Sequence, residues 1–274
     1  MTNTNRGYLD LGDGQIYYEI AGDGVPLILS HAAFLDNRMF DAIWEPLARR
    51  FRVIRYDMRG YGKSSPVHGP LSRRADLEQL LKHLDIPRAH MVGCSYGGEL
   101  VLDLALEHPG QVASLTLVDG TPSGFELKGE PPRYMPEMID AMQRRDVDQA
   151  SELQIRIWLD GEQREPEQVD PELRAKALEM NRIPVTQGTF FLADTHPLNP
   201  LDPPAVTRLE EVHCPTLIIA GSLDHPEVLR AADEMAARIP NARKVVFEGS
   251  AHVPSYEQPE DFVRQLREFL STVS

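Results

Sequence analysis

Short, continuous apolar runs that alternate with helical stretches constrain the fold of this chain most strongly. The runs occupy residues 26–30, 52–56, 89–93 and 112–118. Each has the length and continuous hydrophobicity of a strand that is buried on both faces. Residues 38–50, 72–84 and 96–108 lie between them and have helical spacing of their apolar side chains. This alternation predicts an α/β fold, with a mostly parallel central sheet and helices on both faces.

Two further groups of strands extend the predicted sheet. Residues 7–11 and 15–21 are joined through Gly12-Asp13-Gly14, a strong hairpin signal, and should form an antiparallel edge. Strands at residues 215–220 and 244–247, with helices at 227–239 and 260–270, resume the pattern near the end of the chain. The intervening part is Pro-rich, charged and helical in pattern, with helix candidates at 135–145, 150–159, 171–180 and 185–193. We therefore expect a core domain formed by residues 1–120 and 206–274 and a helical cap formed by residues 121–205.

Charge and composition exclude several classes of partner. The chain has 28 Lys and Arg against 42 Asp and Glu, a formal charge of −14 that repels nucleic acid and anionic membranes. The first ten residues lack a signal-peptide pattern, and no apolar run approaches the roughly 20 residues that span a bilayer. Cys94 and Cys214 lie far apart, without metal-ligand spacing. We expect a cytoplasmic protein that needs no metal or cofactor, and the sequence leaves open whether it forms a homodimer.

The most specific motif is Gly93-Cys94-Ser95-Tyr96-Gly97, which lies between an apolar strand and an apolar helix. A G-x-S-x-G sequence in that context is a nucleophile elbow, a strained turn that exposes the serine. The alternative, a purely structural Gly/Ser turn, does not explain the strand and helix on either side. We therefore predict that Ser95 is a catalytic nucleophile.

A serine hydroxyl needs a histidine base, and the histidine needs a carboxylate that orients it. His252 follows the last predicted strand and is favoured over His225 and His196. Asp224 follows the strand that ends at residue 220, and Asp119, after residue 118, is the alternative carboxylate. The predicted catalytic residues are therefore Ser95, His252 and Asp224.

Acyl transfer also needs hydrogen-bond donors for the developing oxyanion. The backbone N–H of Tyr96, directly after the nucleophile, should supply one. The second should come from the loop after residue 30, and we expect it to be the N–H of Ala33. Packing of Ala32 and Ala33 beneath the sheet edge is the alternative role for that loop.

These motifs together resemble the α/β-hydrolase family over the whole chain outside the predicted cap. The blocks are His31-Ala32-Ala33-Phe34, Asp57 to Ser65, the elbow at Ser95, Gly221 to Pro226 and Gly249 to His252. The family usually has His-Gly at the first block, where this chain has His31-Ala32. The resemblance implies the family's fold and its chain order of Ser95, Asp224 and His252. The block at residues 57–65 resembles a structural turn without a catalytic role.

Single residues distinguish the activities within this family. Ser95 disfavours epoxide hydrolases and haloalkane dehalogenases, which use a carboxylate, and Val253 replaces the lysine that follows the histidine of hydroxynitrile lyases. Carbon-carbon bond hydrolases typically have a glycine-rich first loop, which residues 31–34 lack. A carboxylesterase that cleaves small to medium carboxylic esters through an acyl-serine intermediate is therefore favoured. Its alternatives are an enol-lactonase or other lactone hydrolase and a cofactor-free haloperoxidase. A non-catalytic ligand-binding protein is the rival from another class.

The predicted cap should exclude water and line an apolar pocket of modest size. Our candidates for substrate contact are Phe34, Phe125, Trp158 and Phe190. Burial inside the cap is the alternative role for each side chain that the cap contributes.

Overall fold

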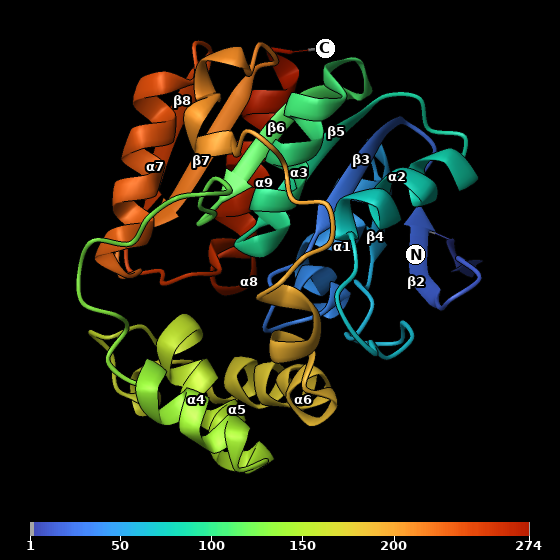
Figure 1. Cartoon of the computed structure of the whole chain (residues 1–274). Coiled ribbons are helices and arrows are strands. Elements are labelled where there is room, and N and C mark those ends of the chain that lie inside the picture. Colours follow the sequence, from blue (N-terminus) through green and yellow to red (C-terminus); the bar gives the residue numbers. More distant parts are fainter. Residues whose placement is uncertain (1–2, 274) are drawn as a thin grey trace.

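An eight-stranded sheet in the order β1-β2-β4-β3-β5-β6-β7-β8 runs through the computed structural model, which describes residues 3–273 (Figure 1). The strands are β1 (Thr4–Asp10), β2 (Gln15–Ala21), β3 (Val25–Ser30), β4 (Phe51–Tyr56), β5 (Ala89–Cys94), β6 (Val112–Val118), β7 (Thr216–Gly221) and β8 (Ala242–Phe247). β2 pairs antiparallel with β1 and β4, and all other neighbours are parallel. The predicted α/β fold with an antiparallel edge is confirmed.

The antiparallel edge follows from the turn that joins β1 and β2. Gly12 has a φ of 86°, a conformation that costs a glycine little. The N–H of Leu11 donates to the carbonyl of Gly14 over 2.8 Å and closes the turn. Asp10 then faces Gln15 in the strand register.

Helices cover both faces of the sheet because successive strand residues point to opposite sides. Ile28 belongs to one core layer and Leu27 and Leu29 to the other. On the Ile28 side lie α2 (Arg73–His83), α3 (Tyr96–Glu107) and α7 (Pro226–Arg238), and on the opposite side lie α1 (Asp41–Ala48) and α9 (Pro259–Ser271). None of the helices formed by residues 3–273 is long and apolar enough to cross a membrane.

Between β6 and β7 the chain forms helices and turns, and we call residues 119–215 the helical insert. Its helices are α4 (Met135–Gln143), α5 (Val147–Ile155) and α6 (Pro171–Gln187), which group together beyond one end of the sheet in Figure 1. α5 continues into a π-helical turn at Arg156–Asp160.

Two details differ from the sequence-based expectation. The prediction of a separate helix at residues 185–193 is wrong at its start, because α6 passes through Pro184 and ends only at Gln187. Gly188, with a φ of 68°, is the left-handed residue that terminates it, and a π-helical turn at Phe190–Asp194 follows. The short helix α8 (Pro254–Glu257), directly after His252, was not predicted.

Candidate active site

Ser95 lies at the sharp turn between β5 and α3. Its φ of 54° and ψ of −122° are strained for a residue with a side chain. The turn is possible because glycines lie on both sides of it: a Cβ on Gly93 would meet the carbonyl oxygen of Gly97 at 2.1 Å, and a Cβ on Gly97 would meet that of Ser30 at 2.4 Å. Because the backbone packs this closely, the Ser95 side chain is presented at the carboxyl end of the sheet.

His252 and Asp224 form a buried pair. Nδ1 of His252 lies 2.6 Å from Oδ2 of Asp224, and both side chains are almost fully buried. The other oxygen of Asp224 accepts the backbone N–H of His225 over 2.7 Å. The carboxylate is thereby fixed, and the second ring nitrogen of His252 remains for a proton-transfer partner.

A cavity of about 230 Å³ contains both Ser95 and His252 in its lining. Its other walls come from the helical insert and from the loops after β6 and β7. They include Thr121, Leu127, Pro132, Met135, Trp158, His225 and Val228. Within residues 3–273 the Ser95 hydroxyl forms no direct hydrogen bond with His252, which is common before a substrate binds. The structure thus brings Ser95 and His252 to one cavity, with Asp224 paired to the other side of the His252 ring.

The loop after β3 is held by the buried ring of His31. Nδ1 of His31 donates to the carbonyl of Ala32 over 2.9 Å, and Nε2 accepts the N–H of Met58 over 2.9 Å. Burial lowers the pKa of His31 to about 4, so the ring is neutral at physiological pH. Ala32 and Ala33 do not adopt a positive φ, and an alanine therefore fits where a glycine is usual.

The backbone N–H groups of the two predicted oxyanion donors, Tyr96 and Ala33, have no acceptor within the described chain. Tyr96 is the first residue of α3, so its N–H has no acceptor within the helix. The Ala33 N–H forms no hydrogen bond with any part of the described chain. The carbonyl of Ala33, in contrast, accepts the Tyr61 hydroxyl over 2.9 Å. Both N–H groups remain available for a ligand.

Asp119 is a second carboxyl group at the site. It is buried, has a positive φ of 45°, and accepts the N–H of Gly221 over 3.0 Å. Burial and the neighbouring Asp224 raise the pKa of Asp119 well above its usual range. The sequence identified Asp119 as the alternative partner of His252; in the structure Asp224 pairs with His252, and Asp119 lies beside Asp224.

Contacts from the helical insert fix the loop that carries His252. The N–H of His252 donates to the carbonyl of Trp158 over 3.2 Å, and the two rings lie 4.5 Å apart. Arg164 pairs with Glu257 over 2.7 Å and donates to the carbonyl of Gly249 over 3.1 Å. Glu257 in turn accepts the Ala251 N–H over 2.8 Å. Arg164 and Glu257 were not predicted as site residues, because nothing in their local sequence marks an ion pair across 93 positions.

The predicted substrate-contact residues lie in different places. Trp158 lines the Ser95 cavity, and the buried ring of Phe34 lies 6.3 Å from that of His252. Phe190 lines a smaller neighbouring cavity together with Ala33. Phe125 is not among the residues that line the Ser95 cavity, and its ring packs 4.1 Å from the guanidinium of Arg230. Contact between Phe125 and a substrate stays a prediction.

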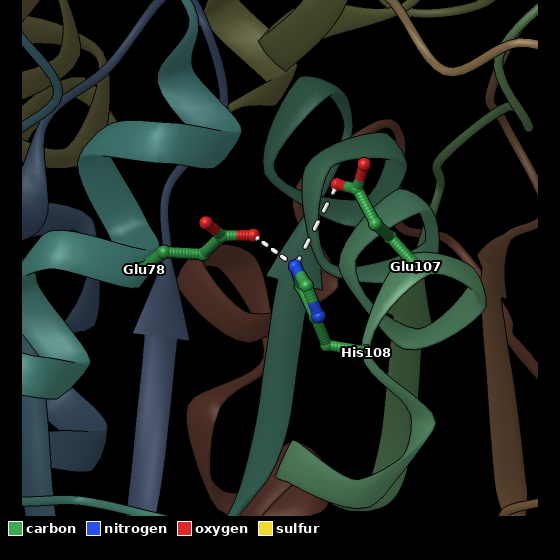
Figure 2. A group of neighbouring side chains, drawn as sticks. All are labelled: Glu78, Glu107 and His108. Atoms are coloured by element: carbon green, nitrogen blue, oxygen red, sulfur yellow. Dashed lines mark ion pairs between the residues drawn. The ribbon is translucent and has the colours of Figure 1, made fainter.

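Three potential metal ligands gather at the other end of α3, away from Ser95. Figure 2 shows Nε2 of His108 directed at Glu78, 2.6 Å away, and at Glu107, 3.9 Å away. Arg74 also pairs with Glu107. These ion pairs account for the cluster, and we assign it to the contact between α2 and α3.

The chain is similar to known proteins over most of its length. The model of the alpha/beta hydrolase fold family matches residues 25–259. A pimeloyl-(acyl-carrier protein) methyl ester esterase of Nitrosomonas europaea is 29% identical, over 90% of this chain and 96% of that protein. The solved structure of Est816, described as an N-acyl homoserine lactone degrading enzyme, has a TM-score of 0.80 at 25% identity and covers 96% of this chain and 100% of that one. A carboxylesterase structure from Nitrososphaera gargenis has a TM-score of 0.77 at 26% identity, over 97% of this chain and 98% of that one.

Proposed function

Because the chain belongs to the α/β-hydrolase fold family, we propose that it is a serine hydrolase that cleaves small carboxylic esters through an acyl intermediate on Ser95. One observation carries the proposal. Ser95, on a strained turn, and His252, paired with Asp224 over 2.6 Å, line the same cavity. A protein that only binds a ligand has no need of this arrangement.

The reaction follows from the positions of these groups. His252 accepts the hydroxyl proton as Ser95 attacks the ester carbonyl, and Asp224 stabilises the resulting imidazolium. The N–H groups of Tyr96 and Ala33 stabilise the oxyanion of the tetrahedral intermediate. His252 then gives the proton to the leaving alcohol. Water repeats the attack on the acyl group and releases the acid.

We assign the helical insert the role of a cap over this cavity. Its Trp158, Pro132 and Met135 line the cavity opposite the sheet, and it contacts the His252 loop directly. A volume of about 230 Å³ suits a short acyl or alcohol group. The cap should exclude water around the tetrahedral intermediate and set the size of the substrate.

The test is turnover of p-nitrophenyl acetate and butyrate by the wild type and by Ser95→Ala. We expect the substitution to lower kcat roughly 10⁴-fold or more, as removal of a triad member does. Ser271→Ala, at an exposed serine near the end of α9, is the matched control and should retain full activity. Retained turnover in Ser95→Ala contradicts the role of Ser95 as the nucleophile. Absence of both ester turnover and fluorophosphonate labelling in the wild type favours a non-catalytic binder.

A lactone is the second candidate substrate. Est816, which resembles this chain over nearly its full length, is described as degrading N-acyl homoserine lactones. The same acyl-serine chemistry opens a lactone, since a lactone is a cyclic ester. Comparing kcat/KM for a γ-lactone with that for an open-chain ester of equal carbon number decides between the two.

A further inference from the structure

Glu99 is a carboxyl group at the catalytic cavity that the proposed mechanism does not use. It lies in the first turn of α3, where its N–H donates to the carbonyl of Ser95 over 3.1 Å. Four residues of helix correspond to about 6 Å along the axis, so Glu99 is close to the nucleophile. Its side chain lines the Ser95 cavity and also a second, smaller cavity beside it.

The Glu99 carboxyl has no partner. Its side chain forms no hydrogen bond or ion pair within residues 3–273. Two arginines line the smaller cavity, but both are engaged elsewhere. Arg73 pairs with Asp194 over 2.6 Å, and Arg74 pairs with Glu107. The Glu99 side chain is half-buried and lines both cavities, so its unpaired carboxyl group is accessible to a ligand beside the nucleophile.

The surroundings of Glu99 favour a cation. Neither lysine nor arginine lines the Ser95 cavity in the described part of the chain. Trp158 and Tyr96 contribute aromatic rings to the same walls, and such rings attract ammonium groups. The net charge of −14 adds a long-range attraction for positively charged substrates.

We propose that Glu99 is an anionic recognition group and that the substrates are small esters carrying an ammonium group a few bonds from the ester carbonyl. The inference rests on the proposed function, since it concerns what Ser95 attacks. An ammonium ion in the cavity pairs with the Glu99 carboxylate and packs against Trp158. The ester carbonyl then lies next to Ser95.

The proposal has a pH signature. Burial, and to a smaller extent Asp103, raises the pKa of Glu99 to about 8. The free carboxyl is therefore mostly neutral below that pH and ionises above it. The groups that face the same region are Asp103 on α3, Arg73 and Arg74 on α2, and Asp119, His225 and His252 at the ends of strands. Preference for a cationic ester should therefore rise with pH through the Glu99 pKa.

The experiment compares matched esters that differ only in charge. Butyrylcholine is paired with 3,3-dimethylbutyl butyrate, in which carbon replaces the nitrogen of the alcohol. For the acyl side, p-nitrophenyl 4-(trimethylammonio)butanoate is paired with p-nitrophenyl 5,5-dimethylhexanoate. The readout is the charged-to-neutral ratio of kcat/KM, which is independent of the amount of active enzyme. The variants are Glu99→Gln and, as a control, Glu260→Gln, which changes the same charge at an exposed residue in the first turn of α9.

We expect wild type to favour the cationic member of at least one pair by about tenfold or more, with a larger ratio at pH 9 than at pH 6. Glu99→Gln should bring that ratio close to one at every pH, and Glu260→Gln should keep the wild-type ratio. Efficient turnover of the neutral esters, with no charge preference or with one that survives in Glu99→Gln, overturns this inference and leaves the proposed function intact. No turnover of any ester, together with an unlabelled Ser95, overturns the proposed function instead.

Discussion

The residue that most clearly joins sequence to chemistry is Ser95. Its φ of 54° costs on the order of 1–3 kcal/mol, and the surrounding strand, helix and loop hold it in place. The sequence predicted this turn because the small residues that permit it are adjacent along the chain. Glu99, only four positions later, was not predicted as a site residue. Its importance depends on which side chains surround it, and those come from distant segments.

A further prediction concerns the protonation of a single residue, Asp119. Burial and the neighbouring Asp224 raise the pKa of Asp119 well above its usual range, so Asp119 should be neutral and able to donate a hydrogen bond to Asp224. Asp119→Asn keeps a donor for Asp224 and an acceptor for the Gly221 N–H, and we expect it to retain most of the activity at pH 7. Asp119→Ala removes both contacts and should lower kcat by about tenfold or more.

The comparison with Asp224→Asn makes this test specific. That variant removes the partner of His252 and should lower kcat by about 10⁴-fold, far more than either change at Asp119. If Asp119→Asn is as inactive as Asp224→Asn, Asp119 is the carboxylate on which His252 depends, and the order of the two acids is wrong. Measurement of kcat for all three variants on one p-nitrophenyl ester settles the order.

Among the elements, the strands were predicted to within a few residues and the helical insert less well. β2 begins and ends at the predicted residues because the hairpin turn at residues 12–14 marks its start, and β6 does so because a strand buried on both faces needs a continuous apolar run. In the insert, helix ends depend on tertiary contacts. Asn181 on α6, for example, donates to the carbonyl of Phe34 over 2.9 Å, a contact that no local pattern encodes. Short-range patterns therefore predict the sheet and the catalytic loops better than the cavity walls.

We expect the contact between the helical insert and the His252 loop to support both catalysis and stability. Arg164 bonds the carbonyls of Leu159 and Gly249 and pairs with the buried Glu257. Arg164→Met should loosen the loop and lower kcat by between about ten- and a hundredfold, because small displacements of a catalytic base are costly. It should also destabilise the fold by about 3 kcal/mol, since Glu257 loses its buried partner.

The control for Arg164→Met is Arg243→Met. Arg243 lies on β8 and forms an exposed ion pair with Glu268 on α9, which this substitution removes. Exposed pairs contribute little, so both its kcat and its urea midpoint should stay close to wild type. An Arg164→Met enzyme that keeps wild-type kcat at a lowered midpoint shows that the ion pair only stabilises the fold.

Buried acidic side chains make the free energy of unfolding of the whole molecule depend on pH. Burial raises the pKa of Asp57 to about 7 and that of Glu99 to about 8, and it raises that of Asp119 well above its usual range. In the unfolded chain these carboxyls titrate near pH 4. The folded protein therefore binds more protons than the unfolded chain at neutral pH, and rising pH removes the protons that favour folding.

We accordingly expect the free energy of unfolding to fall between about pH 6.5 and pH 8, with a slope of up to about 1.4 kcal/mol per pH unit for each such group. The low pKa of His31, about 4, has its effect on stability below this window. Urea unfolding at several pH values measures the slope. Glu99→Gln removes one contributor and should flatten it, whereas Glu260→Gln should not. A free energy of unfolding that is constant or rises over the window shows that these acids are already ionised in the folded protein, and the pH signature of cation recognition by Glu99 then disappears with it.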